Sequence, residues 1–364
     1  MAHRTDKALT YGCNRFMFVN ILFRLGTARE AFDVSMTRVR GGTGGASPPT
    51  GTARARPEGG RPRLGHLRRI RADRALLLFA APGLAYFLFF HYGALFGNVL
   101  AFQDYVPFLG ISGSEWVGLA HFERMFTDPL FWNAVKNTLV IAALQLVFFF
   151  PAPLALALLL NSVVGDTVRR FVQSVVYLPH FLSWVIVVAL FQQMLGGAGV
   201  VNGWLSDLGV GGVSIIGNPD AYGPLVIAQL VWKECGWATI IFLAALSQVD
   251  EQQYEAAALD GAGWWRRLWH VTLPAIRPVI VLLLVLRLGE FLSIGFEQFF
   301  LQRQSVGPET GEVLETFVYF TGFAGGDFGY AAAVGLFKGV IGVALIYAAN
   351  KVAHRLGEQG VYKA

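Results

Sequence analysis

Residues Glu255 to Pro274 read EAAALDGAGWWRRLWHVTLP and form a polar segment between two long apolar runs. The run before this segment extends from Pro224 to Leu246, and the run after it extends from Pro274 to Phe300. About 20 apolar residues are enough for a helix to cross the bilayer. Each run therefore predicts a membrane-spanning helix, because the strands of a membrane barrel would give alternating segments of about ten residues instead.

The composition of the whole chain supports a membrane protein. Of the 364 residues, 54% are hydrophobic and 15% are charged, whereas about 25% of the residues of soluble domains are charged. A soluble chain of this length needs a more polar surface, so the composition argues against the soluble globular, disordered and fibrous classes. Cys13 and Cys235 provide neither a disulfide framework nor the spacing of metal ligands.

Apolar runs of spanning length recur along the chain and divide it into a tail and a membrane body. The predicted spans cover residues 75–98, 134–160, 172–195, 224–246, 274–300 and 328–352. We therefore expect an all-α membrane domain of six transmembrane helices over residues 75–364. Residues 1–74 are rich in Arg, Gly and Pro, a composition that cannot bury enough apolar surface to fold alone. We expect this segment to be a disordered cytoplasmic tail.

Lys and Arg gather in alternate loops, and this pattern predicts the orientation of the chain. Residues 54–74 carry eight Arg, and the loops 161–171 and 247–273 carry two Arg each. By contrast, the loop 196–223 has neither Lys nor Arg. Because basic loops stay in the cytoplasm, we expect both termini to be cytoplasmic. The net charge of +5 thus reflects orientation and not nucleic-acid binding.

The polar segment itself predicts a helix, a tight turn and a second short helix. Residues 251–259 have a helix-forming composition, and the Ala residues after Glu255 leave a smooth face that another protein can approach. Gly261 would end this helix in a left-handed conformation that Gly adopts cheaply. Trp264 to His270 is compatible with a short helix, and Pro274 suits the first turn of the next span.

These residues resemble the EAA loop of the permease subunits of ABC importers. The family pattern is Glu-Ala-Ala, three residues, Gly, nine residues, Ile, one residue and Leu-Pro. This chain matches every spacing and departs from the pattern only by Val271 in place of Ile. The resemblance implies that residues 251–274 dock into a cytoplasmic ATPase. The implied coupling residues are Glu255, Ala256, Ala257, Asp260, Gly261, Leu273 and Pro274.

Other segments resemble the LplB-type permeases of the carbohydrate-uptake group, which includes polysaccharide and alginate importers. These segments are residues 101–105, 116–118, 295–298, 333–338, 349–350 and 355–358. The resemblance covers about residues 75–364 and implies a MetI-like permease fold in the bacterial plasma membrane. It implies import of an oligosaccharide or polysaccharide by alternating access, powered by two partner ATPases. A second, homologous permease and an extracytoplasmic solute-binding protein are the other implied partners, the latter meeting loops 99–133 and 301–327.

The chain itself is predicted to hold no cofactor and to catalyse no reaction. It lacks the phosphate loop G-x-x-x-x-G-K-[ST], the nucleophile elbow G-x-S-x-G and the metal pair H-E-x-x-H. The implied partner ATPases would bind ATP and Mg²⁺. His91 and His180 have no carboxylate at metal-ligand spacing, so we expect neither a metal nor a catalytic role for them.

Ionisable and aromatic residues within the predicted spans mark a candidate substrate path, because charges at membrane depth usually face a bundle interior or a cavity. Lys233 and Trp237 are four residues apart and should share a helix face. Resemblance to maltose-type importers implies sugar contacts from part of the fourth span and from residues 291–298. Glu297 is added because it is an ionisable residue within the fifth predicted span. The predicted path residues are therefore Lys233, Glu234, Trp237, Phe291, Gly295, Glu297 and Gln298.

The same charges have a structural alternative. Arg287, Glu290 and Glu297 would form one stripe on a continuous helix. An ion pair of Arg287 with Glu290, or of either Glu with Lys338, could simply hold helices together. Pro151 and Pro153 should bend the second span, either as a hinge or for packing alone.

Three other functions stay open at this point. An ion-gradient-driven secondary transporter would use Glu290 and Glu297 as proton or cation sites. An ABC importer for a non-sugar solute would keep the EAA loop but not the LplB-like segments. A membrane-embedded enzyme would need a convergent catalytic set, which the sequence does not reveal.

Overall fold

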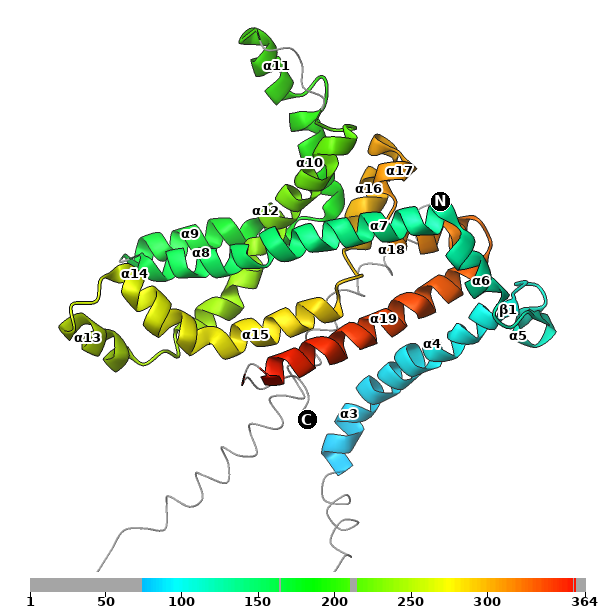
Figure 1. The fold of residues 1–364 in the computed structure, drawn as a ribbon, viewed down its shortest axis with the longest axis horizontal. Coiled ribbons are helices and arrows are strands. Elements are labelled where there is room, and N and C mark those ends of the chain that lie inside the picture. Colours follow the sequence, from blue (N-terminus) through cyan, green and yellow to red (C-terminus); the bar gives the residue numbers. More distant parts are fainter. Residues whose placement is uncertain (1–73, 164, 210–214, 356, 358–364) are drawn as a thin grey trace, which may run out of the picture. The chain divides into compact units, whose positions relative to one another are not determined.

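The structure is a computed structural model that describes residues 74–163, 165–209, 215–355 and 357 (Figure 1). The predicted tail therefore lies outside the described residues, apart from Arg74. The described residues from Leu76 onward belong to one compact unit. Within the described residues, six helical segments are long and apolar enough to cross a membrane, so the predicted number of spans is confirmed.

The first two spans are each built from several helical pieces. The first, Leu78–Phe102, comprises most of α3 (Arg74–Phe87) together with η1 (Leu88–Tyr92), α4 (Gly93–Leu95) and η2 (Phe96–Phe102). The second, Pro129–Ser162, comprises α7 (Pro129–Leu144), η3 (Gln145–Phe149) and α8 (Pro151–Ser162). Between them lie β1 (Gln103–Asp104), α5 (Gly110–Gly113), β2 (Glu115–Trp116) and α6 (Ala120–Thr127).

The third to sixth spans follow in chain order. The third, Trp184–Asp207, contains α10 (Trp184–Leu195) and α11 (Val200–Asp207), and the fourth is α12 (Pro219–Leu246). The fifth, Trp264–Gly289, contains α14 (Trp264–Arg267), η5 (Leu268–Thr272) and α15 (Leu273–Gly289). The sixth is α19 (Phe328–Arg355). The elements outside the spans are α9 (Asp166–Tyr177), η4 (Leu178–Phe181), α13 (Glu251–Leu259), α16 (Phe296–Val306), α17 (Pro308–Gly311), α18 (Leu314–Val318) and η6 (Tyr319–Ala324).

Helix α12 is the centre of the membrane body. It contacts α7, α8, α9, α10, α15 and α16, and 56% of its most apolar 18-residue window is buried, against 6% for the first span. One apolar cluster joins Ile141 of α7 to Val226 of α12 and Phe299 of α16. A second joins Phe242 of α12 to Leu160 of α8 and Ile276 of α15. The fourth span thus supplies the surface on which its neighbours assemble.

The structure corrects the limits of the third and fifth predicted spans. The run 172–195 is interrupted because α9 ends at Tyr177, and residues 182–183 are extended before α10 begins at Trp184. The run 274–300 is interrupted because α15 ends at Gly289 and α16 begins only at Phe296. Leu and Phe side chains continue through both interruptions, so hydropathy alone did not reveal them.

The second interruption also removes a predicted feature. Gly295 adopts φ +110°, a conformation that L side chains rarely take, directly before α16. Because the helix stops at Gly289, Arg287 and Glu297 lie on different helices. The predicted stripe of Arg287, Glu290 and Glu297 is therefore wrong.

The prolines of the second span are accommodated without a break in the helical path. The π turn η3 precedes Pro151, and the N–H of Phe150 donates to the carbonyl of Gln145, five residues back, at 3.0 Å. Pro151 follows at the first turn of α8, and the π turn before it accommodates a residue that has no N–H to donate.

Gly236 marks the closest approach between α9 and α12 and yields a stability prediction. A Cβ at position 236 would stand 2.1 Å from the carbonyl oxygen of Val176. Gly236→Ala should therefore force these helices apart and lower the free energy of unfolding by about 1–3 kcal/mol, measured by thermal unfolding in detergent. Gly335→Ala in α19 is the matched control, because nothing lies within 4 Å of a Cβ there. Equal melting temperatures for both variants would contradict the close packing.

Candidate functional site

The polar segment 251–274 folds into a capped helix, a tight turn and a second helix. The Asp250 carboxylate accepts a hydrogen bond from the Gln252 N–H at 3.0 Å and caps the N-terminus of α13. Gly261 adopts φ +69° and ends the helix, as the sequence predicted. The N–H of Ala262 then donates to the carbonyl of Ala257 at 2.9 Å, which satisfies a carbonyl of the last turn.

One side-chain contact attaches α13 to the helix that follows it, and a second attaches the turn between them. The Tyr254 hydroxyl lies 2.9 Å from the Thr272 hydroxyl, across the turn. The Arg267 Nε donates to the carbonyl of Ala262 at 2.8 Å. Helices α14, η5 and α15 are continuous from Trp264 to Gly289, so the predicted short helix runs into the fifth span without a break. Pro274 lies in the first turn of α15, as expected.

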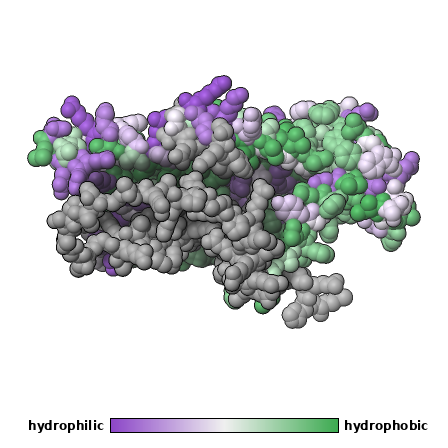
Figure 2. Space-filling view, turned by 90° about the horizontal axis from the view of Figure 1, so that it is seen from below, coloured by the Kyte–Doolittle hydropathy of each residue, from purple (hydrophilic) through white to green (hydrophobic). Residues whose placement is uncertain are grey.

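The outer face of α13 has no partner within the described chain. None of its residues is buried, and the Leu259 side chain is 90% exposed. Helices α13 and α14 lie together at one end of the membrane body in Figure 1, away from α5 and α6. Figure 2 shows hydrophilic side chains at that same end and along the middle of one edge, and hydrophobic side chains over much of the opposite end. The segment therefore presents a small-residue face that another protein can reach.

The path residues of α12 lie against the first interrupted segment. The Lys233 Nζ donates to the carbonyl of His180 at 2.9 Å and to the Glu234 carboxylate at 2.8 Å. The other Glu234 oxygen lies 2.7 Å from the His180 Nδ1. The Trp237 and His180 rings stack at 4.5 Å, only 4° from parallel. Lys233 and Trp237 thus share a face, as predicted, but that face meets His180, which sequence reasoning left without a role.

These four side chains differ in their access to solvent. The Lys233 side chain is 7% exposed, whereas Glu234 and His180 retain 25% and 28%. Trp237 is 47% exposed. The cluster therefore combines a buried Lys233 ammonium, held by a backbone carbonyl, with a Trp237 ring that is partly open to contact. In the sequence, Pro179 is the residue that could have indicated this cluster, because a proline favours the end of a helix. The last carbonyls of a helix lack helical partners, and here the carbonyl of His180 receives the Lys233 Nζ.

The second interruption is held by side chains from two other helices, and a third helix supplies the countercharge of one of them. The Glu315 carboxylate of α18 accepts a hydrogen bond from the Gly295 N–H at 3.2 Å and pairs with Lys338 of α19 at 2.7 Å. The Gln145 Nε2 of η3 donates to the carbonyl of Ile294 at 3.1 Å. These contacts satisfy backbone groups that no helix pairs.

The ion pair considered from the sequence for Lys338 has a different partner in the structure. Lys338 pairs with Glu315 and not with Glu290 or Glu297, so that expected pairing is wrong. The Arg287 guanidinium donates to the Gln145 Oε1 and lies 5.7 Å from the Phe149 ring centroid. The buried side-chain amide of Gln145 thus contacts both Arg287 and the carbonyl of Ile294 in the interrupted segment 290–295.

The remaining predicted path residues fall into two groups. Gln298 is 1% exposed, and its Nε2 donates to Val226 and Gln229 of α12, both at 2.9 Å. Phe291 is partly buried and packs against two apolar clusters. By contrast, Gly295 and Glu297 are exposed. In this conformation Gln298 fastens α16 to α12, and contact of these residues with a solute stays a prediction.

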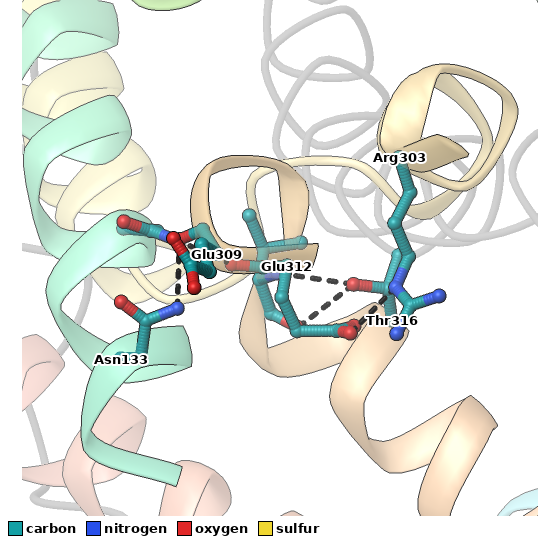
Figure 3. Close-up of polar contacts among 7 residues, drawn as sticks. Asn133, Arg303, Glu309, Glu312 and Thr316 are labelled. Carbon is teal, nitrogen blue, oxygen red and sulfur yellow. Dashed lines mark hydrogen bonds and ion pairs between the residues drawn. The ribbon is translucent and has the colours of Figure 1, made fainter. Parts of the chain in front are cut away.

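A further polar network fixes the short helices after α16 (Figure 3). The Asn133 Nδ2 of α7 donates to the carbonyl of Glu309 at 2.7 Å. Arg303 pairs with Glu312 at 2.5 Å, and its guanidinium carbon lies 4.0 Å from the Phe320 ring centroid. The Thr316 hydroxyl accepts a hydrogen bond from the Val313 N–H at 3.0 Å. This network positions α18, which carries Glu315.

The fold and the exposed α13 segment together define a multi-pass permease subunit of a transport complex. Residues 148–357 match the family described as "Binding-protein-dependent transport system inner membrane component", and the chain belongs to this family.

Relatives and solved structures share most of the membrane body. The chain is 48% identical over 291 residues to the polygalacturonan/rhamnogalacturonan transport system permease protein YteP of Bacillus subtilis, covering 80% of this chain and 91% of that one. It is 46% identical to protein LplB of the same organism, covering 80% and 92%. A chain from the crystal structure of a bacterial alginate ABC transporter, in complex with an alginate pentasaccharide-bound periplasmic protein, superposes with a TM-score of 0.75. That chain is 37% identical, and the match covers 81% of this chain and 99% of that one.

The Glu315–Lys338 pair yields a testable coupling. Both side chains are about one-fifth exposed, at 21% and 20%. Glu315→Gln keeps an acceptor for the Gly295 N–H but leaves Lys338 without its countercharge. We expect a loss of about 1–3 kcal/mol in unfolding free energy, measured by denaturant unfolding in detergent.

The control for this pair is the double variant Glu315→Gln with Lys338→Met. Removing both charges should recover part of the stability that the single Glu315→Gln change loses. Strictly additive losses in the double variant would show that the two side chains do not act as a pair.

Proposed function

We propose that this protein is the transmembrane permease subunit of an ATP-driven importer for an oligosaccharide or polysaccharide. The observation that carries the proposal is α13, a capped helix with a smooth Ala face that ends at Gly261 and is attached to the fifth span. The names of the relatives, for polygalacturonan/rhamnogalacturonan and for the acidic polysaccharide alginate, support a saccharide cargo.

Energy would enter through α13. Two partner ATPases would bind ATP and Mg²⁺ and hold α13 in a cleft, while this chain holds no cofactor. The Tyr254–Thr272 and Arg267–Ala262 contacts would pass the movement of the ATPase to the continuous helix Trp264–Gly289. Because interrupted helices concentrate backbone rotation at their breaks, the segments 178–183 and 290–295 would absorb the change between inward- and outward-facing states.

The topology proposed for this cycle places both termini in the cytoplasm of a bacterial cell. The basic loops 161–171 and 247–273, the latter containing α13, would face the ATPases. A second, homologous permease would complete the path, and an extracytoplasmic solute-binding protein would deliver the saccharide to the opposite side.

The saccharide would meet the cluster on α12. The exposed Trp237 ring suits the C–H face of a sugar, and Glu234 and His180 offer polar atoms for hydroxyl groups. Lys233 is held by the His180 carbonyl and Glu234, so it would contribute positive charge to the site from a fixed position. Phe291, Gly295, Glu297 and Gln298 would form the other side of the path in a conformation that opens α16.

Gly261 provides the test of the coupling role. Gly261→Val forces a β-branched residue into φ +69°, at a cost of about 1–2 kcal/mol, and should disrupt the turn that presents α13. We expect loss of ATPase capture in pull-downs from detergent-solubilised membranes, with membrane insertion unchanged. Gly263→Val is the matched control, because φ is −68° there and nothing lies within 4 Å of a Cβ. Normal ATPase capture by Gly261→Val would refute the coupling assignment.

Lys233 provides the test of the path and its charge preference. Lys233→Met removes the buried positive charge, so uptake of a uronate oligosaccharide should fall about tenfold or more, while uptake of a neutral oligosaccharide of equal length persists. Uptake into proteoliposomes loaded with ATP measures both. Lys136→Met, an exposed lysine of α7, should change neither. Equal losses for both sugars would refute charge recognition, and uptake that continues without ATP would refute the importer itself.

A further inference from the structure

His180 makes three contacts with α12, and each contact uses a different part of the residue. Its carbonyl oxygen accepts a hydrogen bond from the Lys233 Nζ at 2.9 Å. Its ring Nδ1 lies 2.7 Å from the Glu234 carboxylate and is the donor, because an ionised carboxylate can only accept. Its imidazole lies parallel over the Trp237 indole, with 4.5 Å between the ring centroids. One residue thus occupies an ammonium group, a carboxylate and an aromatic face at the same time.

These three occupied groups are complementary to a sugar that carries a carboxylate. An ammonium group binds a carboxylate, a carboxylate accepts from hydroxyl groups, and an indole face stacks on the C–H surface of a sugar ring. One uronate unit offers all three complementary features. It would therefore replace each contact of His180 with a contact of the same kind, so His180 stands where such a unit would bind.

The Trp237 face that His180 covers is the face beside both charged groups. This follows because the single residue His180 reaches Lys233, Glu234 and Trp237 together. The polar atoms of Glu234 and His180 also satisfy each other, so a saccharide hydroxyl must separate them before it can bind to either. Trp237 remains about half exposed, and a solute can therefore reach the stacked rings before they separate.

The segment that carries His180 is short and lightly packed. It consists of the four-residue helix η4, followed by the extended residues 182–183. Leu178 and Phe181, the first and last residues of η4, are 66% and 71% exposed. Burial of these apolar side chains therefore does little to hold η4, and the contacts of His180 supply much of its attachment to α12.

We propose that His180 is a latch that closes the saccharide site in this conformation. A saccharide unit displaces the imidazole from Trp237, takes its place beside Glu234 and Lys233, and moves the segment 178–183 away from α12. The proposal rests on the proposed function, which supplies the saccharide, and goes beyond it by giving His180 control over access to the site. A closed latch lowers the apparent affinity for the saccharide in proportion to the fraction of molecules in which the latch is open.

The experiment uses the complete complex, with both permeases and ATPases, in lipid nanodiscs without a binding protein. Fluorescence anisotropy of a labelled oligogalacturonate measures direct binding of the probe to the permeases. His180→Ala removes the ring but keeps the carbonyl that pairs Lys233, so this variant should bind the probe about threefold tighter than wild type, or more. His180→Phe keeps an aromatic ring for Trp237 and should gain less affinity.

The matched control is His91→Ala in the first span. The His91 ring also stacks on an aromatic ring, with 4.6 Å between its centroid and that of Phe87, so the variant loses a similar contact and should bind the probe like wild type. Adding Trp237→Ala to His180→Ala should abolish the gain in affinity, because the saccharide then loses the aromatic face that the open latch uncovers.

The outcomes separate the latch from the proposed function. With a wild-type complex that binds the probe and imports it with ATP, unchanged or weaker binding by His180→Ala would overturn the latch alone. An equal gain in His180→Phe, or a gain that persists without Trp237, would also overturn it, because the ring of His180 would then not act by covering Trp237. A wild-type complex that neither binds nor imports an acidic or a neutral oligosaccharide would overturn the proposed function.

Discussion

Backbone groups in the hydrocarbon region of a membrane must find partners inside the protein, because no water is there to pair them. This chain breaks two helices, at residues 178–183 and 290–295, and meets the requirement with side chains. Lys233 pairs the carbonyl of His180, Gln145 pairs that of Ile294, and Glu315 accepts from the Gly295 N–H. The directions of α10 and α16 depend on these few contacts.

The same constraint explains why the buried charge of Lys233 both pairs a backbone carbonyl and forms part of a polar cluster. A charge at this depth is costly unless it is paired, and Lys233 has both the His180 carbonyl and Glu234. Because these partners hold Lys233 in place, the neighbouring Trp237 and Glu234 keep part of their surfaces free. A backbone interruption thus places a polar, partly accessible cluster where a continuous helix would present only an apolar face.

The sequence predicted the parts of the fold that depend on local properties. Run length was enough for the number of spans, and the position of Gly261 after a helix-forming segment was enough for the turn that ends α13. Hydropathy failed at the two interruptions because Leu178 and Phe181, like Phe291 and Leu292, are as apolar as the spans around them.

Interactions between distant residues were beyond sequence reasoning. Lys338 and Glu315 are 23 residues apart, and Arg287 and Gln145 are 142 apart. No spacing rule relates such positions, since helical periodicity extends only along one helix. His180 was missed for the same reason: its partner Glu234 lies 54 residues further along the chain.

The π turns η3 and η5 have a consequence for the faces that their helices present. A π turn holds one residue more than the α-helical ladder requires, because its hydrogen bonds span five residues and not four. Each residue advances an α-helix by about 100°. The segments on either side of η5, the Trp-rich start at α14 and the apolar α15, are therefore rotated relative to each other. The Trp-rich and apolar parts of this one helix therefore present different faces for the same spacing of residues.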